Sequence, residues 1–149
     1  MSVFGGDTIH PMDDKGRISL PAKHRRILPD DQVIIIPSPD EQFPSLWIYS
    51  TEAYEQWAAS VIASKGGSQE NSASAYHIKR TLYRRQETVN IDGAGRILIP
   101  VGLRQHASLD KTVRIIGAGE HLELWNDDIL AASDEYYSSQ QQGKILDLP

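Results

Sequence analysis

The chain contains the stretch DDKGRISLP at residues 13–21, and its pattern returns as DGAGRILIP at residues 92–100. Each position of the second copy lies 79 residues after its counterpart, as subtracting 13 from 92 shows. Self-similarity at a fixed offset is the signature of a tandem repeat. The chain is therefore built from two related units.

Both copies predict a tight turn that leads into a β-strand. Gly16 and Gly95 supply the positive φ that such a turn needs, and Asp13 and Asp92 can accept hydrogen bonds from backbone N–H groups of the same turn. The apolar residues that follow alternate, so they point to one face of a strand. A proline then ends each strand, because it has no N–H to donate. The alternating positions are Ile18 and Leu20 in the first copy and Ile97 and Ile99 in the second.

The similarity extends beyond the closing prolines. Arg25 matches Arg104 at the same offset, and the apolar run at 33–36 returns at 113–116 after a gap of 80. LWIYS at 46–50 corresponds to LELWN at 122–126, so the offset falls to 76. We infer a loop shortened by three residues (79 minus 76) opposite residues 37–44. Each copy thus predicts a turn, a strand, a short helical segment, a strand, a loop, a strand and a helix.

Length and composition set the outer bounds. A chain of 149 residues with 40% hydrophobic and 23% charged residues is typical of one compact domain, and we expect one core shared by both repeats. The longest aliphatic run has four residues, at 33–36, which predicts no membrane span. No secretory signal is visible, so we expect a cytoplasmic protein. Without cysteine, the chain has neither disulfides nor thiolate metal sites.

The net charge of −5 argues against an anionic partner, but the charges are unevenly placed. Residues 15–26 contain five basic residues and no acidic one, whereas seven acidic residues and a single lysine lie from 120 onward. This pattern predicts a basic face and an acidic face. The first basic cluster is Lys15, Arg17, Lys23, Arg25 and Arg26, and a second is Lys79, Arg80, Arg84 and Arg85.

Helices are expected between the repeats and after the second one. Ser50 is a plausible N-cap for a helix that ends near residue 64, and a Gly- and Ser-rich loop is predicted at 65–74. A second helix is predicted at 75–87, and a third at 127–142, with a loosely ordered tail after residue 143. The predicted inward positions are Ala53, Trp57 and Val61 in the first helix and Ile78, Leu82 and Tyr83 in the second.

The doubled motif, the opening Phe4-Gly5-Gly6 and the continuation LRQHA at 103–107 resemble the MraZ family, a branch of the AbrB-like DNA-binding proteins. The resemblance covers roughly residues 4–130. It implies an α+β fold, in which two pseudo-symmetric repeats in one chain form a swapped-hairpin AbrB-like β-barrel with flanking helices. We expect a single domain over 1–149, with a first repeat at 5–60, a helical connector at 61–88 and a second repeat at 89–140.

The resemblance also implies a function. Family members are bacterial transcriptional regulators that assemble into rings and bind short direct repeats upstream of the division and cell-wall gene cluster. We therefore expect a sequence-specific regulator, a repressor that acts on its own promoter, in the cytoplasm and associated with the nucleoid. Its expected partners are double-stranded DNA and further copies of the chain. No cofactor, metal, membrane or small-molecule substrate is expected.

The D-x-x-x-R element of the family falls on Asp13 to Arg17 and on Asp92 to Arg96. Arg17 and Arg96 are then the principal DNA-facing groups, and a planar guanidinium fork suits a phosphate or the edge of a guanine. Lys15 has Ala94 as its counterpart, so we expect the first turn to contribute more affinity. The full predicted DNA-binding set is Lys15, Arg17, Lys23, Arg25, Arg26 and Arg96, with Asp13, Gly16, Asp92 and Gly95 shaping the turns.

Simpler roles stay open for these residues. Arg17 could pair with Asp13 or Asp14 and merely fix the turn. Residues 23–26 could form a solvated basic face, and Arg80, Arg84 and Arg85 are more typical of a solvated helix or a subunit contact than of DNA binding. His24 stands where the family usually has an aromatic residue, which leaves the packing there open. The three tryptophans, Trp47, Trp57 and Trp125, lie in periodic apolar patterns typical of a core or a subunit interface.

The sequence is compared with two other classes of protein, an enzyme and an antitoxin-like protein. An enzyme is poorly supported, because the five histidines have no metal-ligand spacing and no nucleophile elbow or phosphate-binding loop is present. An antitoxin-like protein that binds both DNA and a protein partner is the better alternative, because AbrB-type folds also serve that role. Such chains resemble one motif copy plus an extended tail, whereas here a second copy occupies that space.

Overall fold

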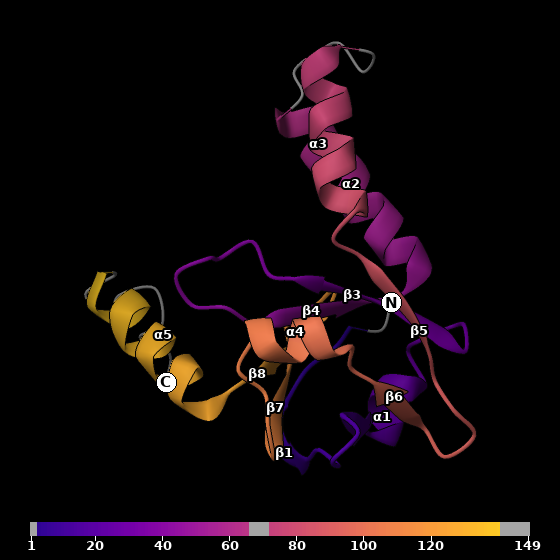
Figure 1. The fold of residues 1–149 in the computed structure, drawn as a ribbon, viewed down its shortest axis with the longest axis vertical. Helices are drawn as coiled ribbons and strands as arrows, with labels where there is room; N and C mark the ends of the chain where they lie inside the picture. Colours follow the sequence, from indigo (N-terminus) through magenta and orange to yellow (C-terminus); the bar gives the residue numbers. More distant parts are fainter. Residues whose placement is uncertain (1–2, 66–71, 141–149) are drawn as a thin grey trace.

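The computed structural model describes residues 3–65 and 72–140, and it is a mixed α+β protein with antiparallel sheets. The order of elements repeats, so that β1 to α2 of the first half is followed by α3 and then by β5 to α5 (Figure 1). The strands are β1 (Asp7–Pro11), β2 (Arg17–Ser19), β3 (Gln32–Pro37), β4 (Leu46–Tyr49), β5 (Glu87–Asn90), β6 (Arg96–Leu98), β7 (Thr112–Gly117) and β8 (Leu122–Trp125). The helices are α1 (Ala22–Arg25), α2 (Thr51–Lys65), α3 (Ala73–Tyr83), α4 (Val101–His106) and α5 (Asp127–Gln140).

The two repeats exchange strands. The main sheet has the order β1-β7-β8-β4-β3-β5, and β2 pairs with β6 in a separate ribbon. The first strand of each half therefore joins the other half, because β1 pairs with β7 and β5 pairs with β3. The central pair, β4 with β8, also joins the halves. Neither half completes its sheet without the other.

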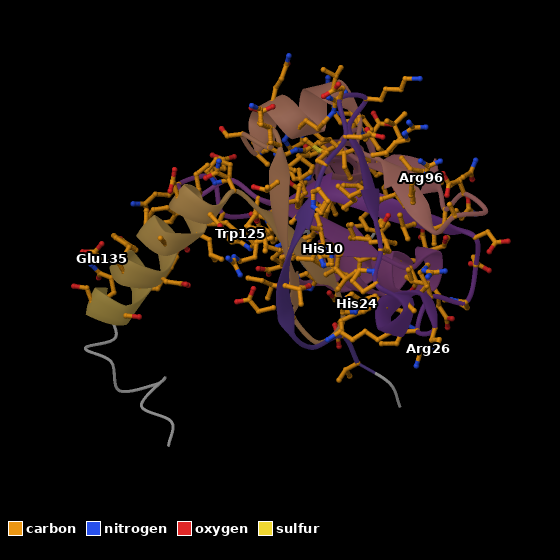
Figure 2. The ribbon with its side chains drawn as sticks, turned by 90° about the horizontal axis from the view of Figure 1, so that it is seen from below. His10, His24, Arg26, Arg96, Trp125 and Glu135 are labelled. Carbon is orange, nitrogen blue, oxygen red and sulfur yellow. The ribbon has the colours of Figure 1, made fainter. Side chains whose placement is uncertain are left out.

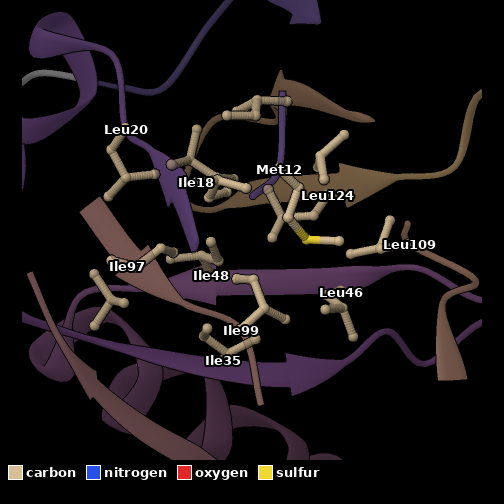
Figure 3. Packing of buried hydrophobic residues seen from close by; sticks show 14 of the residues in the cluster. Met12, Ile18, Leu20, Ile35, Leu46, Ile48, Ile97, Ile99, Leu109 and Leu124 are labelled. Carbon is tan, nitrogen blue, oxygen red and sulfur yellow. The ribbon is translucent and has the colours of Figure 1, made fainter. Parts of the chain in front are cut away.

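The main core contains residues of both repeats. The alternating isoleucines and leucine of the motif are at most 2% exposed, which confirms the inward face predicted from their spacing. Figure 3 shows them packed against side chains of β3 and β4. Burial of each such side chain stabilises the fold by about 1.5–3 kcal/mol. The buried motif positions are Ile18, Leu20, Ile97 and Ile99, and the residues packed against them include Ile35 and Ile48.

The motif prolines and the shortened loop fall where the sequence predicted. Pro21 and Pro100 end their strands and stand as the N-caps of α1 and α4. Residues 38–45 connect β3 to β4, whereas residues 118–121 connect β7 to β8, so this loop is four residues shorter in the second half and not three as predicted, because the offset has already risen from 79 to 80 at β7. The first strand of each half, β1 and β5, was not predicted.

The hairpin of α2 and α3 extends away from the sheets (Figure 1). Ser50 caps α2 as predicted, since its Oγ accepts a hydrogen bond from the Ala53 N–H at 3.1 Å. The predicted inward face of α2 was wrong by one position. The neighbouring stripe of α2 packs on the sheet and on α3; this buried stripe is Tyr54, Ala58 and Ile62. The predicted residues are therefore only half-buried, namely Ala53, Trp57 and Val61.

The ends of α3 also differ from the prediction. Ser72 caps a helix that ends at Tyr83, so the predicted 75–87 helix begins two residues early and stops short of Glu87, which opens β5. Tyr83 does not point inward: it is 37% exposed, and its hydroxyl donates to Glu55 Oε2 at 2.9 Å. Residues 66–71 of the predicted loop, and the predicted tail, lie outside the described residues. Among the helices of the described residues, none has the length and apolar character that a membrane crossing requires.

Candidate nucleic-acid interface

Each motif forms a tight turn that its aspartate holds together. The φ angles of Gly16 and Gly95 are 90° and 80°, which confirms the predicted positive φ. Asp13 Oδ1 accepts hydrogen bonds from the backbone N–H groups of Lys15 at 3.0 Å and Arg17 at 2.8 Å. Asp92 Oδ1 accepts the equivalent two bonds in the second turn, each at 2.9 Å. The two turns are thus nearly identical in geometry.

The aspartate also orients the arginine of its own turn. Arg17 Nε donates to Asp13 Oδ2 at 2.7 Å, and Arg96 Nε donates to Asp92 Oδ2 at 3.0 Å. The structural ion pair weighed for Arg17 therefore exists, with Asp13 as the partner. Because it uses only Nε, it leaves the two NH₂ groups of the fork to bind a ligand, and the Arg17 side chain is 34% exposed.

The hydrogen bonds keep both aspartates ionised. The pKa of Asp13 is lowered from 3.8 to about 2, chiefly by the backbone N–H of Arg17 and then by its guanidinium. The pKa of Asp92 is lowered for the same first reason, the backbone N–H of Arg96. Each turn therefore keeps its charged, arginine-orienting form throughout the physiological pH range.

The pairing of β2 with β6 brings the two turns into one surface. Ile18 lies opposite Ile97, while Arg17 lies opposite Leu98 and Ser19 opposite Arg96. Residues directly opposite each other in an antiparallel pair share a face. Because the isoleucines face the core, Arg17 and Arg96 share the outward face, one at each end of the ribbon. We call this surface, residues 13–19 and 92–98, the turn pair.

Each turn is supported by an arginine of the other repeat. Arg104 Nε donates to the Ile99 carbonyl at 2.8 Å, and its guanidinium lies against Gly16. Arg25 Nε donates to the Leu20 carbonyl at 3.1 Å, and a Cβ on Gly95 would stand 2.7 Å from its Cζ. Arg25 is among the predicted DNA-binding residues, whereas Arg104 is not. The equal spacing of the two arginines was the signal that could have identified the second.

The other predicted basic residues are less closely tied to the turn pair. Lys15 is exposed on the first turn, and Arg26 is exposed at the end of α1. Lys23 lies beside Gly6 instead of a turn. His24 is buried at 2% exposure, edge-on to the Phe4 ring at 5.7 Å, and this burial lowers its pKa. It thus fills the place where an aromatic side chain was expected.

Basic residues near the turn pair and an acidic residue of α5 lie on different sides of the folded molecule. Figure 2 shows Arg26 and Arg96 on the opposite side from Glu135 of α5. The second basic cluster lies on and just after α3, in the projecting hairpin and away from β6 (Figure 1). We call these residues the hairpin cluster; its members are Lys79, Arg80, Arg84 and Arg85.

The fold and the site define a tandem-repeat α+β protein whose halves exchange strands and present two arginine-bearing turns on one face. The model of one protein family, described as "MraZ protein, putative antitoxin-like", matches residues 3–75 and 82–141. The chain belongs to the MraZ family.

Relatives named "Transcriptional regulator MraZ" are similar over most of their length. The protein of Mycoplasmoides gallisepticum is 36% identical over 83% of this chain and 82% of its own. The protein of Methylobacillus flagellatus is 31% identical over 97% of this chain and 95% of its own. The protein of Nitrosococcus oceani is 35% identical over 83% of this chain and 81% of its own. A solution structure from Pyrococcus horikoshii covers 85% of this chain and 100% of its own, at 15% identity and a TM-score of 0.37, too low to define a shared fold.

Proposed function

We propose that this chain is a transcriptional regulator that binds double-stranded DNA through the turn pair. The observation that carries the proposal is the β2–β6 pairing, which sets Arg17 and Arg96 on one outward face. A two-stranded β-ribbon fits the major groove, where arginine forks bind the guanine edge. The names of the relatives support a regulatory role. No enzymatic activity is proposed.

The basic residues divide into two groups by position. The first group is Arg17 and Arg96, which contact base edges or phosphates and are each oriented by the aspartate of the same turn. Lys15, Arg25 and Arg104 lie on or against the turns and neutralise phosphates, while Lys23, beside Gly6, and Arg26, just after α1, add positive charge farther from them. Because the second turn has Ala94 in place of Lys15, the first turn contributes more of the affinity.

We further propose the arrangement that the family resemblance implies. The strand exchange is compatible with a swapped-hairpin barrel in a single domain over 1–149, with repeats at 5–60 and 89–140 and a connector at 61–88. Copies form a ring in the cytoplasm, on the nucleoid, and repress a division and cell-wall gene cluster from direct repeats in its promoter. Rotation within a ring presents successive turns in the same direction, which matches direct instead of inverted repeats.

A ring also compensates for the net charge of −5, which weakens each single contact with DNA. Once one subunit is bound, its neighbours engage the following repeats intramolecularly, at high effective concentration. If each engaged turn neutralises about two phosphates, three turns give a slope of log affinity against log salt concentration of about −5.

Fluorescence anisotropy on DNA from upstream of the chain's own gene tests the proposal. Wild-type protein and the variant Arg17→Ala are titrated over a salt series, with scrambled DNA as competitor. We expect sequence-selective binding by the wild type and a loss of about 1–3 kcal/mol, roughly five- to 150-fold in affinity, in the variant.

The matched control is Arg80→Ala, which removes an exposed arginine from the hairpin cluster. It should bind DNA like the wild type and keep its salt slope. Equal binding by wild type and a folded Arg17→Ala would refute the role of the turn pair. Loss of binding in the control alone would transfer that role to the hairpin.

The word "antitoxin-like" in the family description is the observation that favours a second candidate, a protein that binds DNA and a small protein partner. Copurification of an unrelated small protein in stoichiometric amount would support it. If no such partner copurifies, the wild-type protein alone should bind DNA with its full affinity.

A further inference from the structure

Helix α5 has few contacts with its own chain. Of its fourteen residues, Ser133 alone is buried. Tyr137 donates a hydrogen bond to Asp40 Oδ2 at 2.7 Å, and Phe43 of the β3–β4 loop contacts the rings of Tyr136 and Tyr137, with centroids 5.4 and 5.9 Å away. Helices of this length gain most of their stability by packing an apolar face. A helix so exposed is suited to a contact with another molecule.

The α2–α3 hairpin holds an apolar groove of about 400 Å³. It opens between the two helices and the end of β3, with aliphatic and aromatic side chains along its floor and basic groups on its rim. A groove of this size accepts one or two large side chains. The floor includes Trp57, Val61 and Ile78, and the rim includes Lys65, His77 and Arg85.

The charges of α5 and of the groove are opposite. Helix α5 contains Asp127, Asp128, Asp134 and Glu135 and no basic residue, while Arg85 on the rim belongs to the hairpin cluster. The two surfaces cannot meet within one chain, because α5 and the hairpin project from different parts of the molecule (Figure 1). Opposite charges on two separated surfaces favour contact between copies.

We propose that α5 of one copy docks in the α2–α3 groove of the next copy. Tyr136, which is 38% exposed, enters the groove, and Glu135, which lies beside Tyr136 on the same side of α5, faces Arg85 of the neighbour. Groove and helix are different patches, so the interface is heterologous, and such interfaces close rings when the rotation fits. The inference rests on the proposed ring and names the contact that builds it.

Charge reversal tests the contact by light scattering after size exclusion. Glu135→Arg and Arg85→Glu should each reduce the wild-type oligomer to single chains, with unchanged circular dichroism. An equimolar mixture of the two variants should assemble again, because every groove then meets a helix of opposite charge. Asp110→Arg, at an exposed acidic position outside the interface, should assemble like the wild type. An intact oligomer in either single variant would overturn the docking.

Cysteine cross-linking tests the geometry directly, since the chain has no native cysteine. The double variant Arg85→Cys/Glu135→Cys should yield, on mild oxidation, a ladder of covalent species beyond the dimer. A product that stops at the dimer indicates a two-fold contact and contradicts the heterologous interface. Absence of any intermolecular product, with both thiols shown to be reactive, contradicts the docking itself.

The same variants separate this inference from the proposed function. Arg17→Ala should assemble fully and bind DNA more weakly than the wild type, by the factor given for it above, whereas Glu135→Arg should keep the turn pair intact and bind only a single repeat, with weak, salt-sensitive affinity. A wild type that is monomeric at all concentrations would overturn the ring and the docking while leaving the turn pair to be judged by its own DNA titration.

Discussion

At the residue scale, each motif aspartate has two tasks that share one carboxylate. Its Oδ1 accepts two backbone N–H groups and closes the turn, while its Oδ2 orients the arginine that follows. The structural role and the proposed binding role of Arg17 are therefore compatible, because an ion pair on Nε restricts the side chain before any ligand arrives. Such preorganisation lowers the entropy lost on binding.

The carboxyl titration of Asp13 checks this account. We monitor the titration through the NMR chemical shift of the Asp13 carboxyl carbon, and we expect a midpoint at the pKa of about 2. In Arg17→Ala the midpoint should rise but stay below 3.8, because the backbone N–H of residue 17 still donates. Since the pKa is lower in the folded state, the stabilisation is complete above pH 3.8 and is lost as the pH falls towards 2. A wild-type midpoint at 3.8 would contradict the turn geometry.

At the element scale, each turn depends on a helix of the opposite repeat. The N–H of Ile99 donates to the Gly16 carbonyl at 2.9 Å, and that of Leu20 donates to the Gly95 carbonyl at 3.0 Å. Helix α4 adds Arg104 against Gly16, and the end of α1 adds Arg25 against Gly95. The motif glycines thus serve both the positive φ of the turn and the close approach of an arginine.

Gly16→Ala should destabilise the fold by about 2 kcal/mol, measured by urea unfolding. The φ of 90° strains any residue with a Cβ, and that Cβ would displace the Arg104 side chain from its bond to Ile99. Gly93→Ala is the matched control, because it lies in the second turn with open space around it, and it should change stability by no more than about 0.5 kcal/mol. Equal effects in both variants would disprove this role of Gly16.

The helix α2 shows the limit of periodicity. Residues 53, 57 and 61 and residues 54, 58 and 62 are both spaced four apart and both largely apolar, so spacing fixes the period of the buried stripe but not its phase. The packing of Tyr54 decided it: its ring is buried, and its hydroxyl donates to the Leu82 carbonyl of α3 at 3.2 Å. A contact across 28 residues leaves no local signal in the sequence.

At the scale of the whole molecule, strand exchange couples the two halves. The outer strands β1 and β5 each pair with the opposite half, and the central β4–β8 pair joins the halves again. The ion pairs of Arg114 with Asp7 and Asp127 add a link between β1, β7 and the start of α5. If one half unfolded, the other half would lose strand partners and could not keep a complete sheet.

Unfolding should therefore be a single cooperative transition. Tryptophan fluorescence, which reports on Trp47 and Trp57 in the first half and Trp125 in the second, should coincide with far-ultraviolet circular dichroism in urea. Substitution of the core residue Ile97 by Ala should lower the free energy of unfolding by about 2–5 kcal/mol. Both probes should then report the same lower urea midpoint. Two separate transitions would show that the halves fold independently.

The sequence by itself determined the local features: two repeats, a positive-φ glycine in each turn, the inward alternation after it and the capped start of α2. These follow from backbone sterics and side-chain periodicity, which act over a few residues. Only the tertiary structure decided which partner each element takes. The exposed edge strands β1 and β5 carry no apolar alternation, since backbone hydrogen bonds to distant strands define them. The same non-local pairing put Arg104 beside the turn of the other repeat and set both turns on one face.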